Sequence, residues 1–152
     1  MKRVVFLMLA LVIWAGCTKS DVTRSKQFAH SGCASDATTR AGEDEDAPSL
    51  LILKYENGDL RVTRTNAYMN CSIKTGGIAC DVSIDGNVIR YSVYEKNGAT
   101  ANCICRVEEM SSLVTGLETG KEYIFKYCPN AYSPITFTFK KGLHEIIDVN
   151  TL

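Results

Sequence analysis

The stretch "IACDVSIDGNVIRYSVYE", residues 78 to 95, decides the fold class. In its first half, apolar residues at positions 78, 80, 82 and 84 alternate with small or polar ones. A period of two is typical of a strand with one buried face. Asp85-Gly86 then supplies a turn, and the apolar alternation resumes at Ile89. The stretch therefore predicts a β-hairpin that covers one side of a hydrophobic core.

The same pattern extends over the rest of the chain from residue 49. "LLILKYENGDLRVTRT" (50–65) holds two β-prone runs around Asn57-Gly58, a strong hairpin signal. Four more short runs follow, "CICRVEEMSSLV", "KEYIFKYC", "PITFTFKK" and "HEIIDV", and no apolar run keeps helical spacing for three turns. We expect residues 49–152 to form an all-β domain of about 7–8 strands, an antiparallel sandwich or a related barrel.

One segment favours the sandwich. "GLETGKEYIFKY" places Leu117, Gly120 and Tyr123 at spacings of three. This resembles the tyrosine corner of immunoglobulin-like and fibronectin III-like domains, in which a tyrosine hydroxyl bonds back to upstream backbone where the chain changes sheets. The resemblance implies an immunoglobulin-like or fibronectin III-like sandwich. The alternative is an ordinary turn before a strand.

The N-terminus predicts export. Lys2 and Arg3 precede "VVFLMLALVIWAG" (4–16), an apolar run too short to span a bilayer stably but suited to a signal peptide. Small residues followed by Cys17 resemble the lipobox of bacterial lipoproteins, which implies cleavage after residue 16 and acylation of Cys17. An ordinary secretory signal or a membrane-spanning anchor are the alternatives. Thr18, rather than an aspartate, favours the outer membrane, and which side of the membrane the protein faces stays open.

Residues 17–48 have the composition of a flexible tether. They are rich in Ser, Thr, Ala, Asp and Arg and poor in large apolar residues, so they bury too little surface to offset the entropy of ordering. "FAHSGC" (28–33) is the exception. An aromatic residue and a cysteine within a tether predict a local clip onto the domain.

Charge and motifs argue against several functions. After loss of Lys2 and Arg3, the 17 basic residues become 15 against 17 acidic ones, so we expect no nucleic-acid partner. The two histidines, His30 and His144, do not lie near a Ser or Cys in a recognisable nucleophile arrangement. No glycine-rich phosphate loop is present. We therefore expect no catalytic residues, no enzyme activity and no cofactor.

Six cysteines remain once Cys17 is acylated: Cys33, Cys71, Cys80, Cys103, Cys105 and Cys128. An even number in an exported protein predicts disulfides. Cys103 and Cys105 lie two apart, so on a strand they share a face and need separate partners. We expect these partners to be Cys33 and Cys71, in unresolved order. That leaves Cys80 and Cys128 as a third bridge or as buried thiols.

A wider resemblance covers residues 28 to 128. "LRVTRTNAYMNC", "GGIACDVSIDGNVI", "ANCICRVEE" and "VTGLETGKEYIFKY" are similar to a group of uncharacterised secreted lipoproteins of Bacteroidetes. The resemblance supports fold and location and transfers no activity. We expect a membrane-anchored envelope lipoprotein with a non-catalytic binding or structural module, and its partner would be an envelope protein or a glycan. The alternative is a thiol protein or a Zn²⁺ or Cu⁺ protein that uses Cys71, Cys103 and Cys105.

Overall fold

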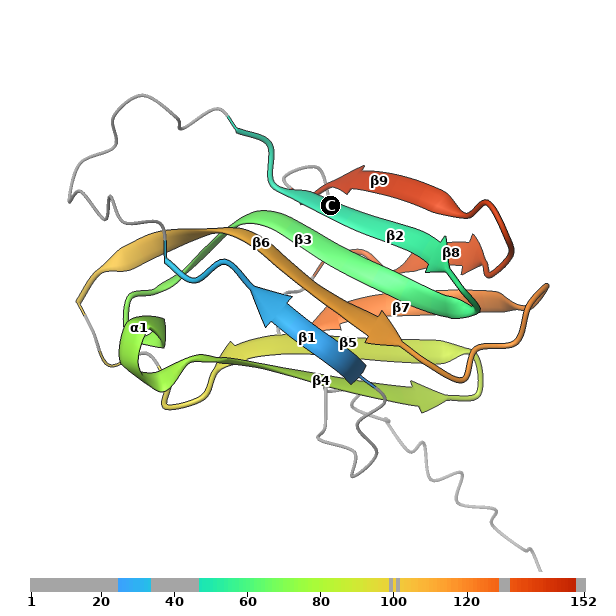
Figure 1. The fold of residues 1–152 in the computed structure, drawn as a ribbon. Coiled ribbons are helices and arrows are strands. Elements are labelled where there is room, and N and C mark those ends of the chain that lie inside the picture. Colours follow the sequence, from blue (N-terminus) through green and yellow to red (C-terminus); the bar gives the residue numbers. More distant parts are fainter. Residues whose placement is uncertain (1–24, 34–46, 99, 101, 129–131, 150–152) are drawn as a thin grey trace, which may run out of the picture.

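The computed structural model describes residues 25–33, 47–98, 100, 102–128 and 132–149. These residues form two β-sheets packed on each other (Figure 1), which confirms the predicted all-β sandwich. The first sheet has the strand order β1 (Ser25–His30), β6 (Ile104–Val114), β3 (Asp59–Asn70), β2 (Leu50–Glu56) and β9 (His144–Asp148). The second has the order β4 (Ile78–Asp85), β5 (Val88–Glu95), β7 (Glu122–Cys128) and β8 (Ile135–Thr138).

Two tight turns make the hairpins that the sequence predicts. Asn57 and Gly58 join β2 to β3, and both have positive φ, 51° and 95°. Positive φ at both central residues is the geometry of a type I′ turn, whose twist matches that of the strands it joins. Gly86, with φ of 61°, lies in the turn between β4 and β5.

One strand pair departs from the antiparallel arrangement that the sequence suggests. β5 and β7 pair in parallel, from Val88 opposite Ile124 to Ser92 opposite Cys128. Parallel neighbours need a crossover connection. After β5 the chain leaves the second sheet and passes through the first sheet as β6. It returns to the second sheet as β7, which lies beside β5 and runs in the same direction. The second sheet is therefore mixed, whereas the strand pairs of the first are antiparallel.

The strand at one edge of the first sheet comes from the segment that the sequence assigns to the tether. β1 pairs with β6, and Cys33 adds an isolated bridge to Val107. β1 also lies beside β4 of the second sheet, on one side of the sandwich (Figure 1). Residues 25–33 thus belong to the sandwich, and the clip that "FAHSGC" predicts extends to a full strand. The rest of the predicted tether, residues 17–24 and 34–46, and the signal peptide lie outside the described residues, as does Cys17.

The inward face of two central strands shifts by one residue partway along. In β3 it runs through Leu60, Val62 and Arg64, then resumes at Ala67. The shift falls at Asn66, whose φ is +49°. Ser49 holds this irregularity, because its hydroxyl donates to the carbonyl oxygens of Thr65 (3.1 Å) and Asn66 (3.0 Å). β6 shifts its phase between Val107 and Met110, opposite the same point.

Aromatic side chains fill the space between the sheets. Tyr91 and Phe125 lie with ring centroids 5.6 Å apart, and both are almost completely buried. The hydroxyl groups of Tyr91 and Ser112 are hydrogen-bonded at 2.9 Å, which joins β5 of one sheet to β6 of the other inside the core. A buried hydroxyl pair of this kind satisfies both polar groups and fixes the register between the layers.

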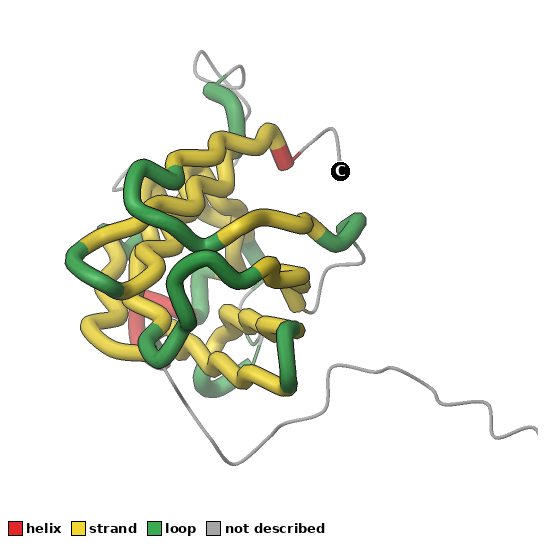
Figure 2. The backbone as a smooth tube through the Cα atoms, turned by 90° about the vertical axis from the view of Figure 1, so that its right-hand side faces the viewer, coloured by secondary structure: helices red, strands yellow, loops and turns green. Residues whose placement is uncertain are grey.

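Helix is a minor component. Figure 2 shows the described backbone as mostly strand, with helix restricted to short segments. The one labelled helix is α1 (Ile73–Gly76), a single turn after β3. The helical residues that the structure describes form no segment long and apolar enough to cross a membrane.

Candidate functional site

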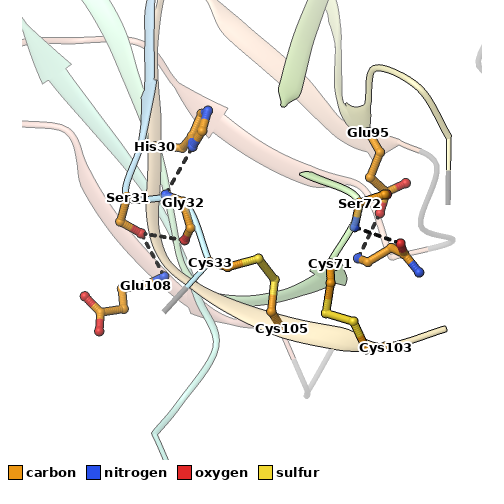
Figure 3. Close-up of a disulfide and its surroundings, with 11 residues drawn as sticks. His30, Ser31, Gly32, Cys33, Cys71, Ser72, Glu95, Cys103, Cys105 and Glu108 are labelled. Atoms are coloured by element: carbon orange, nitrogen blue, oxygen red, sulfur yellow. Dashed lines mark hydrogen bonds between the residues drawn. A yellow bond between two sulfur atoms is a disulfide. The ribbon is translucent and has the colours of Figure 1, made fainter. Parts of the chain in front are cut away.

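Two disulfide bonds lie close together at one end of the sandwich (Figure 3). They join Cys33 to Cys105 and Cys71 to Cys103, each with a Cα–Cα distance of 5.6 Å. The sequence predicts that Cys33 and Cys71 pair with Cys103 and Cys105, and that prediction is confirmed. The structure settles the order that the sequence leaves open. We call these four residues the bridged end.

The Cys71–Cys103 half of the bridged end closes the gap between the end of β3 and the start of β6. The backbone N–H of Cys71 donates to the carbonyl oxygen of Cys103 at 3.1 Å, so a hydrogen bond and a covalent bond join the same pair of residues. Next to it, the backbone N–H of Asn70 donates to a carboxylate oxygen of Glu95 at 3.1 Å. The Ser72 hydroxyl donates to the carbonyl oxygen of Gly98 at 2.9 Å. These bonds connect the end of β3 with the end of β5 and the loop that follows it.

The Cys33–Cys105 half attaches β1 to β6. Just before Cys33, the Ser31 hydroxyl accepts hydrogen bonds from the backbone N–H groups of Glu108 (3.1 Å) and Glu109 (3.2 Å), where β6 shifts its phase. His30 also serves the local backbone, because its Nδ1 accepts from the N–H of Gly32 at 3.1 Å (Figure 3). Both polar side chains therefore have structural partners here.

The third bridge, between Cys80 and Cys128, does not form, because Cys80 keeps its thiol. β5 lies between β4 and β7, so the two cysteines are two strand spacings apart, roughly 10 Å. A disulfide needs Cα atoms within about 7 Å. Cys80 is in phase with the inward-facing Ile78 and Val82 and packs against the core. Cys128 is buried at the end of β7, and its sulfur is in a disulfide bond rather than a thiol.

The alternative metal site at Cys71, Cys103 and Cys105 is wrong for this structure. All three sulfur atoms are in disulfide bonds, and a cysteine binds a metal as a thiolate. Among the residues that the structure describes, no group of three or more His, Cys, Asp or Glu side chains is placed to hold a metal ion. The bridged end is thus a covalent staple rather than a thiol centre.

The tyrosine corner has the geometry that its name requires. The backbone N–H of Glu118 donates to the hydroxyl oxygen of Tyr123 at 2.9 Å, across the connection that carries the chain from β6 to β7. Leu117 is buried beside it. Gly120 has φ of +88°, and its N–H donates to the carbonyl oxygen of Phe139 at 2.7 Å. All three residues that the sequence singles out therefore shape this corner.

Shifted pKa values belong to groups with structural roles. The Arg61 guanidinium forms two hydrogen bonds of 2.6 Å with Glu56, which lowers the pKa of that carboxyl group. Burial raises the pKa of Tyr127 to about 12. Burial also raises the pKa of Tyr91 well above its ordinary value, and the neighbouring Cys80 adds to this shift. None of these groups forms an acid–base pair across a cleft.

The predictions from sequence do not include one buried charged residue, Arg64. Arg64 is 8% exposed and points into the sandwich, and its Nε and Nη1 atoms are buried with no hydrogen-bond partner. A signal was present, because the period of two in "LRVTRT" places Arg64 in phase with Leu60 and Val62. That phase predicts that Arg64 lies on the face of the strand that packs against the core.

Comparison with protein-family models, with curated proteins and with solved structures finds no match to this chain.

Proposed function

We propose that this chain is a lipid-anchored lipoprotein of the bacterial cell envelope, whose disulfide-bridged β-sandwich is a non-catalytic binding or structural module. The pairing of four cysteines in two disulfides carries the proposal. Disulfides form and persist in exported compartments and are rare in the cytosol. The apolar run that ends at Cys17 offers a route to such a compartment.

The anchor would act through Cys17. Each buried CH₂ group contributes roughly 0.8 kcal/mol to membrane binding, so attachment becomes stable when more than one acyl chain is present. The resemblance to secreted lipoproteins of Bacteroidetes and the residue Thr18 favour the outer membrane. The module would contact an envelope protein or a glycan through its loops.

Acylation of Cys17 is the first prediction. Cells that express the wild-type chain and are fed an alkyne fatty acid should yield labelled protein in the membrane fraction. Cys17→Ala should lose the label and the membrane association, because the acceptor thiol is gone. In-gel fluorescence after azide coupling measures both.

Cys80→Ala is the matched control, since it removes a thiol that lies in the folded domain. It should keep the label in full. Equal labelling of the wild type and Cys17→Ala would refute the lipoprotein assignment. A Cys17→Ala protein that is unlabelled but exported with its disulfides intact would separate the anchor from the module.

A further inference from the structure

Arg64 lies on the inward face of β3, surrounded by apolar side chains. Its cross-strand neighbours are Leu51 on β2 and Met110 on β6, both almost completely buried. Side chains directly opposite each other on paired strands share a face, so these two flank the arginine within its own sheet. Leu51 offers no hydrogen-bond acceptor, and the thioether sulfur of Met110 is only a weak one.

Two tyrosine rings lie next to the Arg64 guanidinium. The Arg64 Cζ atom lies 5.6 Å from the ring centroid of Tyr127, on β7 of the opposite sheet. It lies 5.9 Å from the ring centroid of Tyr132. The two rings are 6.1 Å apart and inclined at 50°, so they form two walls around the cation. Cation–π contacts fix the position of a guanidinium but do not use its N–H groups.

Hydrogen bonds do not satisfy all the N–H groups of the Arg64 guanidinium. Nε and Nη1 of Arg64 are buried without a hydrogen-bond partner among the described residues. Arg61, three residues earlier on the opposite face of the same strand, shows the satisfied state, because its Nε and Nη2 hold both carboxylate oxygens of Glu56 at 2.6 Å. Buried polar groups normally have partners, and a buried charge without one is strongly unfavourable.

We propose that Arg64, Tyr127 and Tyr132 form a binding site for a carboxylate group. The planar guanidinium presents donors in a rigid fork that matches the two oxygens of a carboxylate. A carboxylate can bind a guanidinium side-on, through Nε and Nη2, or end-on, through Nη1 and Nη2. In either arrangement one carboxylate oxygen would accept a hydrogen bond from a nitrogen that has no partner in the part of the chain that the structure describes. The tyrosine rings hold the fork in place through cation–π contacts.

The single charge of the site selects a carboxylate over a phosphate. One guanidinium neutralises one carboxylate, whereas a phosphate carries nearly two charges at pH 7 and is usually held by several basic groups. Among the described contacts of this site, Arg64 is the only cation. The site therefore suits the carboxylate of an acidic sugar or of a peptide, and it does not depend on whether the chain is lipidated.

The test uses the purified mature protein and sodium acetate as the probe. Acetate replaces chloride at constant ionic strength while ¹⁵N–¹H spectra follow the Nε–H signals of the arginines. The Arg64 signal, identified by its loss in Arg64→Lys, should shift and reach a plateau as acetate rises. The Arg61 signal is an internal control and should not follow that curve, because Glu56 already occupies its fork.

A second measurement covers stability. Acetate should raise the thermal midpoint of the wild type along the same saturation curve, and should not raise that of Arg64→Met. Arg64→Met should fold, because Met matches the apolar surroundings and removes an unpaired buried charge. If that variant does not fold, the Nε–H titration still decides the question in the wild type. A linear or absent Arg64 shift would overturn the proposal, as would saturation by phosphate and not by acetate.

Discussion

At the scale of single residues, the Tyr123 hydroxyl fixes the connection between the two sheets. It accepts the N–H of Glu118, a backbone donor at a corner where no strand is available to take it. Removing the acceptor leaves that donor without its partner. We expect Tyr123→Phe to lower the free energy of unfolding by about 1 kcal/mol, the usual net contribution of one hydrogen bond. Urea unfolding followed by far-UV circular dichroism measures the difference.

Tyr55→Phe is the control for that comparison. Tyr55 also packs its ring against a core aromatic residue, Phe139, at 5.2 Å, and its hydroxyl has no hydrogen bond among the described residues. It should lose much less stability than Tyr123→Phe. Equal losses in the two variants would show that the hydroxyl of Tyr123 contributes nothing beyond its ring.

The buried tyrosines make the fold sensitive to alkali. Burial raises the pKa of Tyr127 to about 12, against an ordinary value of 10.0. The folded state thus keeps a proton that the unfolded state loses. The resulting stabilisation is complete below pH 10 and is lost as the pH rises towards about 12. Two pKa units correspond to roughly 3 kcal/mol in total, of which about half should be lost between pH 9 and 11.

Urea unfolding of the wild type and of Tyr127→Phe at these two pH values tests the assignment. The variant should lose less stability between them, because phenylalanine has no proton to release. Tyr91 should account for part of the loss that remains, since burial also raises its pKa. The same pH dependence in both proteins would exclude Tyr127 as a contributor.

Some residue roles follow from the sequence and others need the topology. The separate partners of Cys103 and Cys105 follow from their spacing, because side chains two apart on a strand share a face. A bridge from Cys80 to Cys128 is also compatible with the sequence, since both cysteines lie on predicted strands. Only the strand order shows that β5 separates them. Neighbour relations between strands depend on contacts distant in sequence, which local patterns do not contain.

At the scale of elements, β1 is the strand that composition hides. Its sequence, "SKQFAH", has one large apolar residue, Phe28, and no alternation of buried and exposed positions. What holds it is pairing with β6 and the bond from Cys33 to Cys105. Both are tertiary interactions. The sequence shows only the aromatic residue and the cysteine, which suffice to predict a clip but not a strand.

Loss of the Cys33–Cys105 bond should therefore release β1 before the rest of the sandwich. In Cys33→Ser/Cys105→Ser, we expect faster hydrogen exchange at the amides of β1 and at the β6 amides that pair with it. β4 and β5 should keep their protection, because their own hairpin does not depend on this bond. Hydrogen exchange read by mass spectrometry of peptides covers both regions.

Cys80→Ala serves as the control for the loss of a cysteine side chain, and it should leave β1 protected. Unchanged exchange in β1 of the double variant would mean that backbone pairing alone holds the strand. Uniform loss of protection in all strands would instead mean that the bond stabilises the fold as one cooperative unit.

At the scale of the whole molecule, the hairpins and the layers were predictable, while the way they are joined was not. Alternation and turn residues such as Asn57-Gly58 specify strands and their local pairing. The parallel pairing of β5 with β7 follows from the passage of β6 through the other sheet. Nothing in the local sequence of β5 or β7 encodes that passage. It results from how the complete set of apolar faces is buried at once.

The two disulfides are nested, because Cys71 and Cys103 both lie between Cys33 and Cys105 in the chain. The outer bond closes a loop with a sequence separation of 72 residues. In the chain-entropy account, closing a loop of that size lowers the conformational entropy of the unfolded state and so raises its free energy by about 4 kcal/mol. The inner bond then restricts a chain that is already closed, so the two contributions are not independent.

The nesting also determines how the molecule carries a mechanical load. If the chain is pulled at Cys33 and at the C-terminal end of β6, the tension passes through the sulfur atoms to Cys105 and leaves along β6. β2, β3, β4 and β5 lie inside this covalent bypass and bear no tension along their backbone. At about 3.5 Å per residue, the bypass withholds roughly 250 Å of chain from extension. Under such a load, four of the nine described strands, β2 to β5, would stay out of the force path for as long as the Cys33–Cys105 bond stays oxidised.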